Sequence, residues 1–510
     1  MVMQDFLIMN AGGYPILSVL IFAPLVGALV ILFLRDEEVS KYWTMAVTLL
    51  IAALSLPLYT GFDKSTYKYQ FGEHHTWITS LDINYTIGID GISLLLVLLT
   101  TFIMPLCVLC SWRYITKRVR HFMISLLIME SSMIGVFCAL DFALFYVFWE
   151  AMLIPMYLLI AVWGGPRKVY ASTKFFLYTL AGSVLMLVAI IALYMEVGTF
   201  SIPMMMGKGY SFIFQVWVFL AFFLAFAIKV PMFPFHTWLP AAHVEAPTAG
   251  SVLLASVLLK MGTYGMLRLC LPIAPAATVE FMPYILWLSI ISILYGGYTA
   301  LGQSDMKKLI AYSSVGHMGF VTLGIFVLNR NGIEGALLQM INHGVTTGAL
   351  FMCVGMIYER THSRELADAT AIGKLMPIFV TYLGFFSISS LAFPGTNSFV
   401  GEFLVLAGSF AKYKILSACA IPGAILAAAY MLRMLQKVIW GGENDHGNPT
   451  LIDLNLREII TLAPLLIFVF WIGLAPEPFL NVMHTSVEHL LGQVNAGNSE
   501  YMAMLSNIPH

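Results

Sequence analysis

Charged residues are scarce in this chain. Of its 510 residues, 26 are Lys or Arg and 27 are Asp or Glu. This is 10%, against about 25% in soluble proteins. The composition excludes a soluble globular protein, and the 60% of apolar residues also excludes a disordered chain. The net charge of −1 leaves no basic surplus for the phosphates of a nucleic acid.

Cysteine is also rare, and the common cofactor motifs are missing from the sequence. The six cysteines are too scattered for a disulfide framework, and the CxxC pair of Cys107 and Cys110 has no second pair to complete a metal site. The sequence contains no phosphate-binding loop, no GxGxxG turn and no thiolate set for an iron–sulfur cluster. We therefore expect no metal or redox cofactor on this chain itself.

Long apolar runs are abundant. A membrane-spanning helix needs about 20 mostly apolar residues, and fourteen segments qualify. They are residues 14–34, 42–60, 91–112, 121–140, 142–163, 174–196, 213–235, 248–269, 282–302, 309–328, 334–357, 376–411, 415–439 and 458–480. Pro394-Gly395 interrupts the long twelfth run, and Pro231 and Pro234 should break the seventh span near its end. The sequence thus predicts an all-α polytopic membrane protein with about 14 transmembrane helices.

The order of the spans predicts an internal repeat. Spans 4–8 (121–270) and spans 9–13 (282–439) each place a broken helix fourth. Because each unit has five spans, the second must be inverted relative to the first, as recurs in transporters. A three-helix segment (1–112) precedes the units, and a loop, the last helix and a C-terminal tail (440–510) follow.

Basic residues are distributed unevenly between the two sides of the predicted bundle. Seventeen lie in loops after odd-numbered spans, and seven lie in the termini and the loops after even-numbered spans. The positive-inside rule then places both termini on the outer face of the membrane. The remaining two, Lys229 and Lys260, lie within spans.

Six spans carry an isolated ionisable residue near the middle of the membrane. These residues are Glu150, Lys229, Lys260, His317, His343 and Glu402. A charge there costs about 2.5–3.5 kcal/mol on insertion scales, so such residues are rare and usually functional. Any one of them could instead be structural, as a carboxylate–lysine pair holding helices together or a satisfied core histidine. Six on six different spans favour a chain of protonatable groups, because helices in lipid normally pack through small and neutral polar residues.

The chemistry of these groups favours proton movement. A lysine buried in low dielectric loses its preference for the charged form, and a nearby carboxylate restores it. Moving that carboxylate, or changing its charge, would load or unload the lysine. Weaker candidates are Glu130, an intramembrane acid without an assigned role, His236 and His243, which flank the broken span and could serve proton entry, and His74 and His75, which we expect in a solvated loop.

Several stretches resemble a known family. They are IGIDGISLLLVLLT (87–100), LFYVFWEAMLIPMYLLIAVWG (144–164), the run 225–268 with its signature HTWLPAAHVEAPTAGSVLLASVLLK, SDMKKLIAYSSVGHMGF (304–320) and FPGTNSFVGEFLVLAGSF (393–410). The chain is similar over roughly residues 80–480 to the proton-translocating M subunits, also called chain 4, of NADH:quinone oxidoreductase, respiratory complex I. These subunits are related to those of multi-subunit sodium/proton antiporters.

The resemblance implies a role for each isolated residue. Glu150 looks like the fifth-helix glutamate that partners the seventh-helix lysine, here Lys229. Lys260 resembles the central-axis lysine of helix eight, and Glu402 the terminal ionisable group of helix twelve. His317 and His343 match histidines on the hydrated axis between them.

The resemblance also implies partners and a location. The chain would assemble with other membrane-arm subunits of complex I, including sister antiporter-like subunits. NADH, FMN, iron–sulfur clusters and quinone would then be bound by partner subunits, and pumping would be coupled to their redox chemistry. The membrane would be a bacterial inner membrane or a mitochondrial inner membrane.

Two alternatives to the redox-driven pump are a subunit of a sodium/proton antiporter and a structural membrane scaffold. Antiporter relatives and sister pump subunits usually carry lysine at the twelfth-helix position, whereas chain 4 carries glutamate, as Glu402 does here. This residue favours the enzyme complex. The scaffold does not explain the isolated charges.

Overall fold

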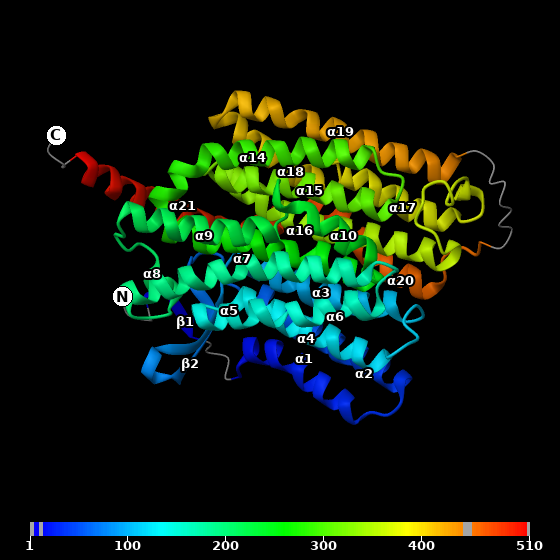
Figure 1. The fold of residues 1–510 in the computed structure, drawn as a ribbon, viewed down its shortest axis with the longest axis horizontal. Helices are drawn as coiled ribbons and strands as arrows, with labels where there is room; N and C mark the ends of the chain where they lie inside the picture. Colours follow the sequence, from blue (N-terminus) through cyan, green and yellow to red (C-terminus); the bar gives the residue numbers. More distant parts are fainter. Residues whose placement is uncertain (1–4, 10–13, 442–450, 507–510) are drawn as a thin grey trace.

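The computed structural model describes residues 5–9, 14–441 and 451–506. Its long helices run side by side in one bundle, with the first helices, α1 and α2, along one flank and α19 along the opposite flank (Figure 1). A small sheet and the last helix, α21, lie together at one end of this bundle (Figure 1). We call this end the α21 face.

Thirteen segments of the described residues are helical, long and apolar enough to cross a membrane. They are α1 (Ile16–Phe33), α2 (Glu37–Thr60), α3 (Leu94–Ser111), α4 (Val119–Cys138), α5 with α6 (Phe142–Ala151, Leu153–Trp163), α7 (Lys168–Val197), α9 (Phe212–Lys229), α11 to α13 (Thr248–Leu253, Leu259–Gly265, Leu271–Ile273), α14 (Pro275–Leu301), α15 (Met306–Phe326), α16 (Arg330–Thr361), α19 (Lys414–Trp440) and α20 (Leu456–Leu474). The shorter helices α17 (Pro377–Ser390) and α18 (Asn397–Lys412) lie where the sequence predicts the twelfth of its fourteen spans. The polytopic helical fold predicted from the sequence is confirmed.

Two spans are broken where the prolines predicted it. α9 ends at Lys229, and after a non-helical stretch and a 3₁₀ turn, η3 (Phe235–Thr237), the chain resumes as α10 (Trp238–Glu245). The apolar helix of the seventh span thus ends at Lys229, just before Pro231, because a proline lacks the N–H that the hydrogen-bond ladder needs. The twelfth span breaks between α17 and α18, where Gly395 has φ +90. The inverted relation of the two five-helix units stays a prediction.

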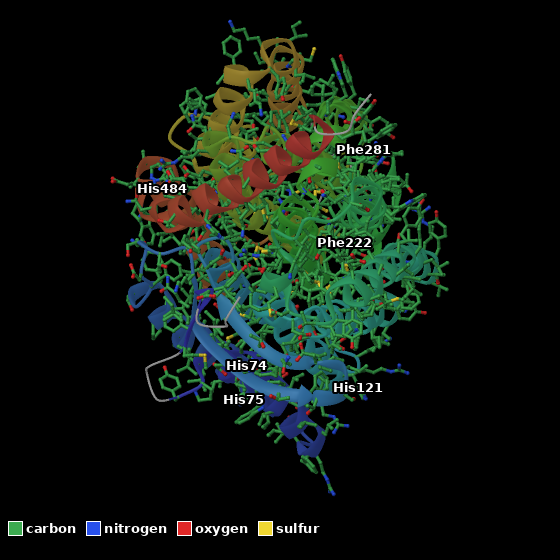
Figure 2. The ribbon with its side chains drawn as sticks, turned by 90° about the vertical axis from the view of Figure 1, so that its left-hand side faces the viewer. His74, His75, His121, Phe222, Phe281 and His484 are labelled. Carbon is green, nitrogen blue, oxygen red and sulfur yellow. The ribbon has the colours of Figure 1, made fainter. Side chains whose placement is uncertain are left out.

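A three-stranded sheet departs from the purely helical expectation. It comprises β1 (Leu7–Met9), β2 (Tyr69–Ile78) and β3 (Ile83–Ile89), with β1 parallel and β3 antiparallel to β2. His74 and His75 lie on this hairpin at the α21 face and not in a loop (Figure 2). The strand also places the buried Glu73 carboxylate on the backbone N–H groups of Leu17 and Ser18, at 2.9 and 3.2 Å, at the start of α1. A carboxylate is stabilised at a helix N-terminus by those unpaired donors and by the helix dipole.

The polar C-terminal tail forms a long helix, α21 (Glu477–Ser506), which lies across the end of the bundle (Figure 2). Its apolar face, including Val482, Met483 and Val487, is buried. At Gly91 its backbone approaches so closely that no side chain would fit beside Val482 O, and the Gly91 N–H donates to Ser486 Oγ at 3.0 Å. The remaining short elements are η2 (Thr79–Leu81), α8 (Ile202–Met205), π-helical turns at Leu254–Leu258 and Met266–Cys270, and η6 (Ile372–Lys374).

Candidate functional site

Glu402 and His317 are in direct contact inside the bundle. His317 Nδ1, on α15, lies 2.9 Å from Glu402 Oε1, on α18, and both side chains are buried. Gln339 Nε2, on α16, donates to the same carboxylate oxygen at 3.0 Å. Ser390, the last residue of α17, places its hydroxyl 3.3 Å from His317 Nε2. The break in the twelfth span thus brings two of its residues to one histidine.

Neutral polar side chains hold this break in place. Asn342 Nδ2 on α16 donates to the backbone carbonyl of Asn397, the first residue of α18, at 2.8 Å. Ser389 Oγ donates to Asn397 Oδ1 at 2.5 Å, and Thr346 Oγ1 lies 2.9 Å from Ser389 Oγ. Non-helical backbone at membrane depth must be satisfied by protein groups or water. Asn342 supplies such a partner to the Asn397 carbonyl, and the Ser389 and Thr346 contacts join side chains across the break.

Lys260 and His343 form the second contact. Lys260 Nζ lies 2.7 Å from His343 Nδ1 on α16, and it also donates to the Ala255 carbonyl. The chain is π-helical over Leu254–Leu258, immediately before the helical turn that carries Lys260. Such π turns are frequent at functional sites. Lys260 is fully buried and faces the interior.

The two contacts lie close enough to form one line of polar groups. The ring centroids of His317 and His343 are 5.8 Å apart. The line therefore runs Lys260–His343–His317–Glu402 and draws one residue each from α12, α16, α15 and α18. His343 Nε2 is buried without a protein hydrogen-bond partner, so this ring retains a free polar atom for a water or a transferred proton.

Glu150 and Lys229 are neighbours without a direct ion pair in the described structure. Lys229 Nζ lies 5.2 Å from the centroid of the Trp149 ring, 5.8 Å from that of Phe175 and 3.7 Å from Met152 Sδ. Glu150 acts on Lys229 electrostatically, but its Oε1 atom is buried without a hydrogen-bond partner. The Lys229 ammonium would therefore be favoured both by the field of Glu150 and by the aromatic faces, whose attraction for a cation strengthens on desolvation.

Lys229 and Lys260 lie on helices that pack closely. A Cβ at Gly262 on α12 would lie 2.9 Å from Phe226 O and 3.1 Å from Lys229 Cβ on α9. Glycine is therefore required at this crossing. The described residues supply no continuous hydrogen-bonded chain from Lys229 to Lys260, so the six predicted residues fall into a connected group of four and a separate group of two.

Three of the weaker candidates, His236, His243 and Glu130, are buried and have no hydrogen-bond partner among the described residues. His243 stacks on Phe351 with ring centroids 4.5 Å apart, and neither of its ring nitrogens has a hydrogen-bond partner. The ring nitrogens of His236 and both carboxyl oxygens of Glu130 are likewise without partners among the described residues. These groups lie outside the connected line of four.

Two buried polar residues with partners on other segments of the chain were not singled out in the sequence. Gln339 is neutral and one helical turn before His343, so its position on the same face of α16 was the available signal. Arg268 was not singled out either; it lies near the end of the eighth span, which extends to Ile273, and it is buried. Its Nη2 lies 2.5 Å from Asp90 Oδ1, and its Nη1 donates to Tyr69 Oη at 3.0 Å. This ion pair borders a cavity of about 100 Å³ at the α21 face.

Comparison with known proteins identifies the family. Residues 139–427 match the family described as NADH:quinone oxidoreductase/Mrp antiporter, TM. The chain is 45% identical over 487 residues to "NADH-ubiquinone oxidoreductase chain 4" of Marchantia polymorpha, covering 94% of this chain and 98% of the relative. It is 44% identical over 512 residues to "NADH-quinone oxidoreductase subunit M" of Rhodobacter capsulatus, covering 95% and 99%.

The fold agrees with this assignment. A chain of "Respiratory complex I from Thermus thermophilus with bound NADH" superposes with a TM-score of 0.86 at 30% identity, covering 94% of this chain and 99% of that one. The matched family region contains all four residues of the buried polar line and also Glu150 and Lys229. The chain therefore belongs to the transmembrane family of NADH:quinone oxidoreductase and Mrp antiporter subunits.

Proposed function

We propose that this chain is the antiporter-like, proton-translocating subunit of an NADH:quinone oxidoreductase complex. The observation that carries the proposal is the buried line of Lys260, His343, His317 and Glu402. Each of these groups can exchange a proton, and each lies where an isolated polar group is costly. Its relatives at 44–45% identity bear complex I subunit names, so the sodium/proton antiporter alternative is not favoured.

The geometry supports stepwise transfer along the line. A protonated Lys260 can give a proton to His343 Nδ1 across 2.7 Å, within the range of a direct hydrogen bond. Transfer from His343 to His317 crosses the gap between the rings, which a bridging water would span. His317 can then pass the proton to Glu402 across 2.9 Å. Gln339 keeps the carboxylate oriented by donating to it.

Glu150 and Lys229 would control the loading of this line. Lys229 sits at the end of α9, beside the break, where its charge depends on Trp149, Phe175 and the field of Glu150. Withdrawal of the Glu150 charge would disfavour the ammonium, since a buried cation without a counter-charge is expensive. A change of charge at Glu150 would thereby be transmitted to Lys229 and from there to Lys260 on the packed neighbouring helix.

The proposal assigns the redox chemistry to other subunits. NADH, FMN, iron–sulfur clusters and quinone would be handled by partners, and this chain would join the membrane arm beside sister antiporter-like subunits. The membrane would be a bacterial inner membrane or a mitochondrial inner membrane, with both termini on its outer side. That orientation rests on the distribution of Lys and Arg between the loops.

Purification in mild detergent followed by reconstitution tests the proposal. We expect the chain to co-purify with subunits that oxidise NADH and reduce quinone. In vesicles, NADH turnover should change the pH of the interior in the absence of sodium. A Lys260→Ala complex should lower the number of protons moved per electron. A chain that purifies without redox subunits, or proton movement that requires sodium, would instead indicate the antiporter class.

A further inference from the structure

A second group of ionisable side chains lies at the α21 face, near the end of the buried line. Glu334 on α16 accepts from Arg330 Nε at 2.9 Å and from His484 Nδ1 on α21, 2.6 Å away. Arg330 Nη1 also donates to Glu488 on α21 at 2.7 Å. We call Arg330, Glu334, His484 and Glu488 the α21-face cluster.

The cluster is graded from the interior to the solvent. The side chain of Glu334 is 6% exposed, that of His484 is 30% exposed and that of Glu488 is 58% exposed. His484 lies at the periphery of the end of the bundle that α21 crosses (Figure 2). A buried carboxylate in contact with a half-exposed imidazole can pass a proton between the interior and water, because histidine changes charge near neutral pH.

Glu334 is near the terminal residue of the buried line. It lies five positions before Gln339 on α16, a rise of about 7.5 Å at 1.5 Å per residue. Gln339 hydrogen-bonds Glu402, so a short segment of one helix joins the two sites. The four residues between them, 335–338, are glycine or apolar.

A tight helix contact separates the two sites. A Cβ at Gly335 would lie 2.7 Å from Leu404 Cβ and 2.7 Å from the Val405 backbone nitrogen on α18. A Cβ at Gly401 would lie 2.6 Å from Gln339 Oε1. α16 and α18 are thus in backbone contact between Glu402 and Glu334. Since α18 is joined to α17 by a non-helical link, it can shift against α16 without bending a continuous helix.

We propose that Glu334 and His484 form the site at which the buried line exchanges protons with the α21 face. The inference rests on the proposed function of the chain. When α18 separates from α16 at Gly335, water enters the gap, and the proton of a neutral Glu402 carboxyl passes through that water to the Glu334 carboxylate, then to the His484 imidazole and then to the solvent. Glu402 is left as a carboxylate held by His317 and Gln339.

The charges around Glu334 suit this exchange. Arg330 on α16 and His484 on α21 face Glu334 directly, and Glu488 reaches it only through Arg330. Arg330 keeps its charge throughout and stabilises the deprotonated carboxylate between transfers. If the cluster merely clamped α21 to α16, the Arg330–Glu488 and Glu334–His484 contacts would matter equally. If it is a proton-exchange site, only Glu334 and His484 are needed for pumping.

The experiment uses the whole complex in proteoliposomes and measures protons moved per electron. Glu334→Gln and His484→Gln remove the exchanging groups. Glu488→Gln is the matched control, because it weakens the exposed ion pair and leaves Glu334 and His484 in contact. We expect the first two variants to lower the ratio to that of Lys260→Ala and Glu488→Gln to keep the wild-type ratio. If Glu334→Gln fails to assemble, His484→Gln and Glu334→Asp, which keeps a carboxyl, decide the question.

The outcomes separate this inference from the proposed function. A wild-type ratio in Glu334→Gln or His484→Gln, with Lys260→Ala still impaired, would overturn the exchange site and leave the proposed function standing. An equal loss in all three cluster variants, with less chain in the complex, would show a clamp. A wild-type ratio in Lys260→Ala would count against the proposed function itself.

Discussion

Lys260 Nζ and His343 Nδ1 lie 2.7 Å apart, although 83 residues separate them in the chain. When Lys260 is protonated, its ammonium can only donate a hydrogen bond, so His343 then accepts through Nδ1 and carries its own hydrogen on Nε2. Nε2 is buried and has no protein partner. Protonation at Nδ1 would therefore release the Nε2 hydrogen on the other side of the ring, and the imidazole can transfer a proton without turning over.

Lys260→Ala should be the most damaging change in the line. It removes the amine that donates to His343 and leaves that ring without its partner. His317→Ala should impair pumping less, because water can partly occupy the space beside Glu402. The number of protons moved per electron in the reconstituted complex ranks Lys260→Ala and His317→Ala. The exposed Lys208→Ala is the control. Equal activity of Lys260→Ala and Lys208→Ala would remove Lys260 from the pathway.

Glu402 should require a carboxyl group. Glu402→Ala deprives His317 and Gln339 of a shared buried acceptor and should abolish coupled turnover. Glu402→Asp should retain part of it, since a shorter carboxylate can still exchange a proton. Coupled NADH:quinone turnover and proton uptake in vesicles report both effects. Intact uptake in the alanine variant would make Glu402 a bystander.

Glu150→Gln should abolish pumping while the complex still assembles. The change removes the counter-charge felt by Lys229, whose ammonium then depends on Trp149 and Phe175 alone. The exposed Glu196→Gln on α7 is the control for loss of one carboxylate. Proton-to-electron ratios should fall in the first variant only. A Glu150→Gln complex that pumps at the wild-type ratio contradicts the pairing.

Asp90→Asn should destabilise the α21 face. Arg268 is buried with Asp90, and breaking a buried ion pair at one partner costs about 3–5 kcal/mol. The double change Asp90→Leu with Arg268→Met should be milder, because it leaves no unpaired charge. Thermal unfolding of the purified complex compares the two. A double variant as unstable as Asp90→Asn would show that the pair itself, not the orphaned charge, stabilises this end.

Docking of α21 should weaken on acidification. His489 stacks on Tyr67 with ring centroids 3.8 Å apart, and burial lowers the pKa of His489 below its usual 6.5. The folded protein therefore favours the neutral ring. The neutral His489 ring contributes its full stabilisation above pH 6.5. This stabilisation is lost as the pH falls from 6.5 through the lower pKa that His489 has in the folded protein. The charge of Asp90 raises the pKa of His489 and so opposes the effect of burial, whereas the charge of Arg268 lowers it further.

Hydrogen exchange along α21 between pH 5 and pH 8 measures this effect. Wild-type α21 should lose protection at the acidic end. His489→Phe, which keeps an aromatic ring on Tyr67 without a titrating group, should flatten the difference. The same pH profile in His489→Phe and wild type would rule out His489 as the titrating group.

Local sequence was sufficient for the crossings and their breaks. Apolar runs of about 20 residues can cross a membrane only as helices, because every backbone polar group must be satisfied within the segment. Pro231, Pro234 and Pro394 lack the N–H that the ladder needs, so the seventh and twelfth breaks follow from composition alone. The isolated charges were equally visible, because each stands out in an apolar run.

Only the tertiary structure decided which of these groups meet. Four helices contribute Lys260, His343, His317 and Glu402. Their spacing in the sequence does not show that Lys260 and His317 lie 2.7 and 2.9 Å from their partners His343 and Glu402, or that the two histidine rings have centroids 5.8 Å apart. Nor does it show that Glu150 and Lys229 form no ion pair. Gln339, Arg268 and Glu334 acquire their roles from partners on other elements. Hydrophobicity along a segment determines that it crosses the membrane, whereas helix rotation and packing determine which side chains share its interior.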